Sequence, residues 1–103
     1  MKRIDKIKAM LLESPTDCFL QHALALEFIK IGNDAAARQL FEEVLNREPT
    51  YVGSYYHLAK LLEKNEHIEQ AIAVYEKGMQ VAKQVGDHHA FGELRGAYEE
   101  LTF

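Results

Sequence analysis

The sequence predicts an all-α protein built from repeated helix hairpins, and two observations carry that prediction. Pro15 and Pro49 are separated by a 34-residue interval, and each follows a short polar stretch at the end of an apolar, helix-periodic run. When residues 18–51 are aligned with residues 52–85, only five of 34 pairs are identical, but the matches fall at packing positions. A period of this length indicates a repeated helix-turn-helix unit. Such a unit stacks on copies of itself, because a single unit cannot bury its apolar face alone.

The matching pairs place a large residue beside a small one in the first helix, and a small residue four positions before an aromatic one in the second. They are Leu24 with Leu58, Ala25 with Ala59, Ala37 with Ala71, Phe41 with Tyr75 and Glu42 with Glu76. Two antiparallel helices joined by a short turn approach closely only where small side chains face large ones. A bulky substitution at Ala37 or Ala71 is therefore expected to overpack the hairpin.

The first helix is predicted from about residue 2 to residue 12, with Ile4, Ile7 and Leu11 on one face. A shift by one repeat length places Ile7 on Phe41 and Leu11 on Leu45. This helix therefore imitates the second helix of a repeat, and we expect residues 1–15 to form an N-terminal cap.

Turn and capping residues place the next four helices within two repeats, 18–51 and 52–85. The expected boundary residues are Thr16 or Asp17, Gly32, Asn33 or Asp34, Pro49, Thr50, Asn65, Gly86 and Asp87. The helix that begins near His67 meets no proline and is expected to continue to Val85. It should be longer than its counterpart, which ends near Arg47, by about one turn.

A sixth helix is predicted from His88 to Leu101, and residues 87–101 are expected to form a C-terminal cap. Its apolar residues fall within one arc of about 120° at 100° per residue. They are Ala90, Phe91, Leu94, Ala97, Tyr98 and Leu101, whereas Glu93, Glu99 and Glu100 lie outside the arc. The complete prediction is a chain of about six helices with no strand.

These positions resemble the tetratricopeptide repeat family, whose 34-residue unit has large, small and aromatic residues at set places. In the first unit they are Leu24, Ala25, Phe28, Gly32, Ala37, Phe41, Val44 and Pro49, and in the second Tyr55, Leu58, Ala59, Leu62, Ala71, Tyr75 and Gly78. The departures from the pattern are Gln21, Glu66 and Lys83, where the family often has a bulky residue, glycine and proline. The resemblance implies a right-handed solenoid of antiparallel hairpins.

In that family the first helix of each unit lines a concave surface, which implies where a protein or peptide partner would bind. The residues at the implied contact positions are Phe19, His22, Leu26, Lys30, Tyr56, His57, Lys60 and Lys64. An apolar first half beside a charged second half suits an amphipathic helix or an extended peptide with one hydrophobic anchor. A simpler interpretation is that Phe19 and Leu26 only pack against neighbouring helices. The lysine and asparagine clamp with which some relatives hold chaperone tails is not matched, because His22, Leu26 and His57 stand at its places.

Composition argues against nucleic acid and membranes as partners. Twelve Lys and Arg against 16 Asp and Glu leave a net charge of −4. The basic residues Lys2, Arg3, Lys6 and Lys8 are interpreted as the solvated face of the first helix.

No apolar run reaches the roughly 18 residues of a membrane span, and the N-terminal segment has no apolar core typical of a signal peptide. We therefore expect a cytoplasmic protein, a prediction that the single Cys18 supports weakly.

No constellation of residues predicts catalysis, a cofactor or a metal site. His88 and His89 are adjacent, so their side chains point about 100° apart on a helix and do not converge. For Cys18, the sequence indicates no neighbouring base that could activate the thiol. The predicted function is a non-enzymatic module that binds a peptide or helix of a partner in the concave groove. Two alternatives stay open, a self-assembling homo-oligomer such as a homodimer, and an accessory subunit of a larger complex.

Overall fold

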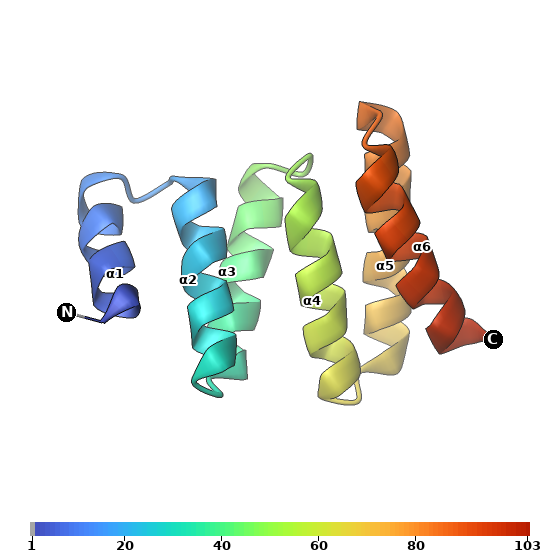
Figure 1. The fold of residues 1–103 in the computed structure, drawn as a ribbon, viewed down its shortest axis with the longest axis horizontal. Coiled ribbons are helices and arrows are strands. Elements are labelled where there is room, and N and C mark those ends of the chain that lie inside the picture. The colour runs from blue at the N-terminus through green and yellow to red at the C-terminus, as the bar shows by residue number, and fades with distance from the viewer. Residues whose placement is uncertain (1) are drawn as a thin grey trace. The chain divides into compact units, whose positions relative to one another are not determined.

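The computed structural model describes residues 2–103 and contains six α-helices, with no strand in that range. The helices are α1 (Arg3–Glu13), α2 (Cys18–Lys30), α3 (Asp34–Arg47), α4 (Val52–Lys64), α5 (Ile68–Val85) and α6 (His88–Thr102) (Figure 1). The chain divides into two compact units, Met1–Glu48 with α1 to α3 and Pro49–Phe103 with α4 to α6. The predicted six-helix, all-α fold is confirmed, and the division into two repeats with a cap at each end stays a prediction.

In the first unit, α1 packs on α2 through one face. Ile7 is buried on that face with 2% of its surface exposed. Around it, Arg3 forms an ion pair with Glu27 at 3.4 Å, and the Lys8 ammonium lies 5.6 Å from the centroid of the Phe28 ring. Both contacts join α1 to α2, in addition to the burial of Ile7, the single buried residue of the first helix.

The N-termini of α2 and α3 are capped by short polar side chains. Asp17 accepts a hydrogen bond from the Leu20 amide at 3.1 Å, and Asn33 accepts one from the Ala36 amide at 3.2 Å. Of the two residues expected at each place, the structure therefore selects Asp17 and Asn33. Each bond satisfies an amide that the helix itself leaves unpaired.

The core of the α2–α3 hairpin consists of the small and large residues that the alignment paired. Ala25, Ala37, Phe41 and Val44 have no exposed surface, and Leu24 is 6% exposed. The two alanines allow the helices to approach closely, while the Phe41 ring fills the space between them. The close packing predicted from the sequence is confirmed in this hairpin.

Gln21, a departure from the family pattern, is buried in a polar network instead of an apolar contact. It is 5% exposed, its Nε2 donates to the Pro15 carbonyl at 3.3 Å, and its Oε1 accepts from Arg47 at 2.7 Å. Arg47 also donates to the Thr16 carbonyl at 3.5 Å. The end of α3 is thereby attached to the segment that precedes α2, and the buried amide has its partners.

The N-cap of α4 lies one residue later than expected. Thr50 lies in a turn with Pro49, and the N-cap of α4 is Tyr51, whose side chain makes no capping bond. The prediction that Thr50 starts this helix is therefore wrong. The reason is that the turn at Pro49 and Thr50 delays the entry into helical geometry, while Tyr55 fastens the segment by donating to the Pro49 carbonyl at 2.7 Å.

The turns of the two hairpins share one backbone geometry at positions one repeat apart. Gly32 has φ +81° and Glu66 has φ +65°, both left-handed. In the first turn the Asn33 amide bonds to the Phe28 carbonyl at 2.9 Å, and in the second the His67 amide bonds to the Leu62 carbonyl at 2.8 Å. Both bonds follow the Schellman pattern that terminates a helix. Glu66 is the single described non-glycine residue with positive φ, so the second turn carries the strain that glycine avoids in the first.

We expect Glu66→Gly to raise the free energy of unfolding by about 0.5–1 kcal/mol. A residue with a Cβ in the left-handed conformation costs about 1–2 kcal/mol, and glycine removes this cost. The greater conformational freedom of glycine in the unfolded chain offsets part of the gain. Gly32→Ala is the matched control, because a Cβ there meets no atom within 4 Å and only the backbone strain is added. Denaturant titration should show the two substitutions shifting stability in opposite directions, and a shift of the same sign would contradict the argument.

The remaining part of the second unit matches the predicted boundaries. The helix α5 has 18 residues against 14 in α3, which is about one additional turn. Gly86 ends it in the left-handed conformation at φ +76°, and Asp87 then caps α6 by accepting from the Ala90 amide at 3.0 Å. Leu94 and Ala97 are buried on the face of α6 that packs on α5.

Candidate functional site

The four predicted contact residues of the first unit lie along α2 with different accessibility. Phe19 is 69% exposed, and Lys30 is exposed and pairs with Glu27 at 3.0 Å. His22 and Leu26 are half-buried. The His22 ring contacts the ring of the core residue Phe41 edge to face, with centroids 5.5 Å apart. The helix therefore presents an exposed aromatic ring near its start and a charged end.

The predicted contact residues of the second unit lie along α4 and touch one another. The Lys60 ammonium lies 6.0 Å from the centroid of the Tyr56 ring and 3.9 Å from a Glu63 carboxylate oxygen. The Tyr56 and His57 rings meet edge to face at 5.5 Å. Lys64 is exposed one turn beyond Lys60. Desolvation lowers the pKa of His57, whereas the negative charge of Glu93 acts in the opposite direction.

Two acidic residues of α6 act electrostatically on residues of α4 and α5, which the sequence did not predict. Glu93 acts electrostatically on His57, and Glu100 acts on the Tyr75 hydroxyl, which donates to Glu63 at 2.7 Å. The charge of Glu93 therefore reaches a residue of α4, and the charge of Glu100 reaches a residue of α5. Their spacing in the sequence could have indicated that Glu93 and Glu100 share one side of the helix, because residues two turns apart lie on the same side. From the sequence, both glutamates are assigned only to the polar side of a cap helix.

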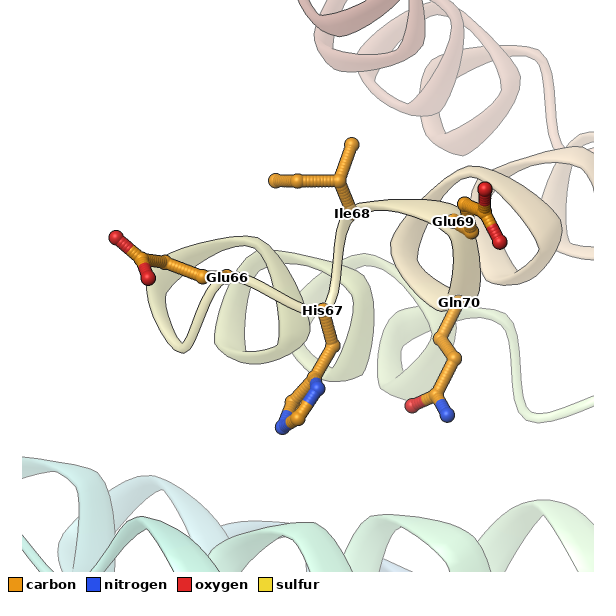
Figure 2. A pocket seen from close by; sticks show the side chains of 5 residues that line it. All are labelled: Glu66, His67, Ile68, Glu69 and Gln70. Atoms are coloured by element: carbon orange, nitrogen blue, oxygen red, sulfur yellow. The ribbon is translucent and has the colours of Figure 1, made fainter.

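A hollow of about 330 Å³ lies elsewhere, at the turn between α4 and α5, but it does not form a chemical site. Its lining residues are Glu66, His67, Ile68, Glu69 and Gln70. Figure 2 shows His67 and Ile68 pointing in opposite directions and the two glutamates pointing apart. Catalysis requires side chains that converge on one reacting atom, and these diverge.

The candidate reactive groups have environments typical of structural residues. Cys18 is buried, and desolvation, followed by its interaction with Glu48, raises the pKa of its thiol, which disfavours the reactive thiolate. His88 and His89 are exposed, and His89 lies 3.5 Å from a Glu93 oxygen. Within residues 2–103 no group of three or more His, Cys, Asp or Glu side chains is placed to hold a metal ion.

Across the described part of the chain, none of the helices combines the length and the apolar character that a membrane-spanning segment needs.

The paired small and aromatic core residues, the repeated turn at a 34-residue interval and the antiparallel hairpins point to one family. A sequence model described as tetratricopeptide repeat matches residues 32–98, which is more than half of the chain. The chain belongs to the tetratricopeptide repeat family. The family resemblance inferred from the sequence is therefore confirmed.

Solved structures agree with this assignment to the tetratricopeptide repeat family. A tetratricopeptide repeat domain protein from Salinibacter ruber is 40% identical in sequence, and its crystal structure matches with a TM-score of 0.80 over 84% of this chain and 96% of that one. A protein from Bordetella parapertussis, solved in solution, is 22% identical and matches with a TM-score of 0.86 over 99% and 89% of the two chains. The predicted fold class, an all-α tetratricopeptide-like helical solenoid, is confirmed by these matches.

A third solved structure has the same fold at low sequence identity. The TPR2B domain of yeast Sti1, solved in a complex with pHsp70, is 14% identical and matches with a TM-score of 0.89 over 96% of this tetratricopeptide repeat chain and 79% of that domain. At this identity the match shows the fold alone. A search of curated proteins found no significant match.

Proposed function

We propose that this chain is a non-enzymatic protein-interaction module that binds a peptide or helix of a partner protein through the exposed faces of α2 and α4. The observation that supports this most directly is the accessibility of the positions that the family uses for contact. Phe19 is 69% exposed, the Lys60 side chain is 42% exposed, and Lys30 and Lys64 are exposed. Aromatic and charged side chains presented by rigid helices are typical of recognition surfaces.

The complex of the yeast Sti1 domain with pHsp70 supports a protein or peptide as the class of partner. That domain shares the fold of this chain, so the same scaffold is compatible with partner binding. Its partner is not carried over, because the lysine and asparagine clamp that some relatives use is absent at His22, Leu26 and His57. Recognition depends on the few residues at the face and not on the fold.

The two faces differ in chemistry and so demand different features of the partner. On α2, Phe19 and Leu26 offer apolar surface, which fits a hydrophobic anchor residue. On α4, Tyr56 presents a ring beside the Lys60 ammonium, which fits a residue with an acidic group. An amphipathic helix or an extended segment with one apolar anchor contains both kinds of residue.

We expect Lys60→Glu to abolish partner capture from a native extract while leaving the fold intact. The substitution reverses a partly exposed charge, and such surface changes usually alter stability by less than about 0.5 kcal/mol. Lys77→Glu is the matched control, because Lys77 is exposed on α5 and its reversal changes the net charge equally. Tyr56→Ala should also weaken capture.

The measurement is affinity capture followed by identification of the retained proteins, with circular dichroism and thermal melting of each variant. Retention by the wild type and by Lys77→Glu, but not by Lys60→Glu at unchanged melting temperature, is the expected result. Equal retention by all three proteins would contradict a role for the α4 face.

A second candidate function is self-assembly into a homo-oligomer, favoured by exposed apolar residues. Phe103 is 94% exposed and Phe19 is 69% exposed, so both rings stand largely in solvent. Burial of such rings in a contact between copies would be favourable. Sedimentation that shows a monomer at every concentration would exclude this candidate. An accessory subunit that positions an enzyme is a third candidate, and a copurifying enzyme would distinguish it. For all three we propose a cytoplasmic location.

A further inference from the structure

The first helix, α1, is attached to the rest of its unit by few buried side chains. Among the described residues of α1, Ile7 alone is buried. The helix at the other end of the chain, α6, buries Leu94 and Ala97. It is also tied to α5 by a hydrogen bond of 3.1 Å from the Tyr98 hydroxyl to Glu76. Fewer buried apolar side chains therefore oppose the detachment of α1 than the detachment of α6.

The charges of α1 oppose its helix dipole. Lys2 stands at the N-cap and makes no side-chain capping bond. Arg3 and Lys6 follow in the first turn with the acidic Asp5, and Glu13 lies in a last turn that holds no basic residue. Positive charge at a helix N-terminus and negative charge at its C-terminus are both unfavourable. A helix of 11 residues is also too short to be stable alone, so α1 persists only while it is packed on α2.

The loop between α1 and α2 supplies a point at which the chain can open (Figure 1). From Pro15 onward the backbone is held by the α2–α3 hairpin, because Gln21 donates to the Pro15 carbonyl at 3.3 Å and Asp17 caps α2. Ser14 precedes these attachments, and a proline disfavours the helical conformation in the residue before it. Opening at Ser14 breaks the bond of 3.1 Å from the Asp17 amide to the Ser14 carbonyl and leaves the hairpin intact.

The surface that α1 covers on α2 is too apolar to stay exposed. From Leu20 to Ile29 of α2, all residues except Gln21, His22 and Glu27 are apolar, and every residue in this range is buried or half-buried. The helix packs against α1 and also against α3. A helix that is apolar on several sides needs cover on each of them. Loss of α1 therefore leaves apolar surface in water until another helix takes its place.

The contacts of α1 define the kind of helix that fits this surface. Arg3 pairs with Glu27 at 3.4 Å, and the Glu27 side chain is only 15% exposed. The Lys8 ammonium lies 5.6 Å from the centroid of the Phe28 ring. Ile7, which is buried, lies between Arg3 and Lys8 in the sequence. A replacement helix must supply two cations and an apolar residue at the same spacing, and a second copy of the chain carries that helix.

We propose that α1 detaches from α2 by opening at Ser14, and that two copies of the chain exchange it, each placing its α1 on the α2 of the other. The contacts between α1 and α2 are the same in the monomer and in the exchanged dimer. The two forms therefore differ in the connecting loop and in the entropy of association, and the dimer is favoured as concentration rises. The exchange does not require a partner protein, and it gives the self-assembly considered above a defined contact.

Native-state hydrogen exchange tests the detachment of α1. We expect the amides of α1 to exchange at least about tenfold faster than the protected amides of α2 and α3, because α1 opens without unfolding the hairpin. Equal protection of the three helices would overturn the proposal, since α1 would then open only together with the rest of its unit.

Two charge-reversed variants that rescue each other test the exchange. Arg3→Glu and Glu27→Lys each place like charges opposite one another when α1 packs on the α2 of its own chain. In an exchanged dimer of the two variants, one contact has the native charges and the other has both charges reversed, so both contacts are attractive. An equimolar mixture should therefore contain mixed dimers in about fivefold excess over the statistical ratio by native mass spectrometry, and the excess should decrease as salt rises.

Arg38→Glu and Glu42→Lys are the matched control variants, because they make the same charge reversals in a pair that lies within α3, at 3.3 Å. Exchange of α1 does not bring these two positions of different copies together, so their mixture should give the statistical ratio. A chain that carries both Arg3→Glu and Glu27→Lys restores the attraction within one molecule, and it should dimerise like the wild type.

The outcomes separate the exchange of α1 from the functions proposed above. A wild-type dimer whose charge-reversed variants show no preference for mixed pairs would overturn the exchange and leave self-assembly through another surface intact. A wild type that sediments as a monomer at every concentration would overturn both. Neither result would affect the capture of a partner protein, which is measured separately with the Lys60→Glu variant.

Discussion

Tyr75→Ala is expected to lower the free energy of unfolding by about 3–5 kcal/mol, the range for removal of a buried aromatic side chain. Tyr75 has no exposed surface and is the largest fully buried side chain among the described residues. Its ring lies in α5 at the position that repeats Phe41 in the second unit. Truncation would leave a cavity that the rigid helices around it cannot close.

The Tyr75 hydroxyl makes a smaller contribution than its ring. It donates to a Glu63 carboxylate oxygen at 2.7 Å, and Tyr75→Phe keeps the ring while removing this bond. The Glu63 side chain is 29% exposed and can rebind water, so we expect a loss of about 1 kcal/mol. Denaturant titration of both variants separates the two parts. Equal losses in Tyr75→Phe and Tyr75→Ala would contradict the assignment of most of the stability to packing.

The same hydroxyl makes stability depend on pH in alkaline solution. Desolvation, followed by the bond to Glu63, raises the pKa of Tyr75 above its usual value of about 10. The folded state therefore holds this proton more tightly than the unfolded state. Its contribution is fully present below about pH 10 and decreases as pH rises further. Tyr75→Phe should reduce the slope of stability against pH in that range.

Gly78→Ala is expected to lower the free energy of unfolding by about 1–3 kcal/mol through overpacking. A Cβ on Gly78 would lie 2.7 Å from the Tyr55 Cβ and 3.1 Å from a Leu94 methyl carbon. The Tyr55 Cβ is attached directly to the backbone of α4, so it cannot move aside by a change of rotamer. The helices α4 and α5 would have to separate, which loses contacts along the hairpin.

Gly92→Ala is the control for this prediction, because it makes the identical chemical change in an open place. A Cβ on Gly92 of α6 would meet no atom within 4 Å. Alanine should therefore stabilise the chain by about 1 kcal/mol through helix propensity alone. Thermal and denaturant unfolding should give opposite signs for the two substitutions. A stabilising Gly78→Ala would show that close approach of α4 and α5 is not needed.

The local boundaries of the helices were predictable because they depend on residues close together in the chain. An N-cap joins a side chain to an amide three positions later, so Asp87 was found from order alone, and Asp17 and Asn33 were each one of two expected residues. The left-handed end at Gly86 was predictable for the same reason. The prediction that Thr50 starts α4 was wrong, because threonine is common both in turns and at helix N-caps, and only the backbone conformation distinguishes the two.

The candidate site stays a prediction. The contact positions on α2 and α4 follow from a repeat register, and several of them are exposed, as a contact surface requires. The electrostatic effect of Glu93 on His57 was not predicted, because Glu93 was assigned to the polar side of a single helix. This effect depends on the packing of α4 and α6 on α5, and no local pattern encodes which side of a helix meets which neighbour.

By itself, the sequence determined the family, the six helices and the small and large residues of each core, since helical periodicity and the 34-residue repeat are properties of the order of residues. Only the tertiary structure decided that Gln21 bonds to Arg47, that Glu66 adopts a left-handed backbone conformation, and that the charge of Glu93 acts on His57. These features join residues that are distant in the chain or depend on backbone geometry. They form only when the helices pack, because packing brings the participating atoms within range of one another.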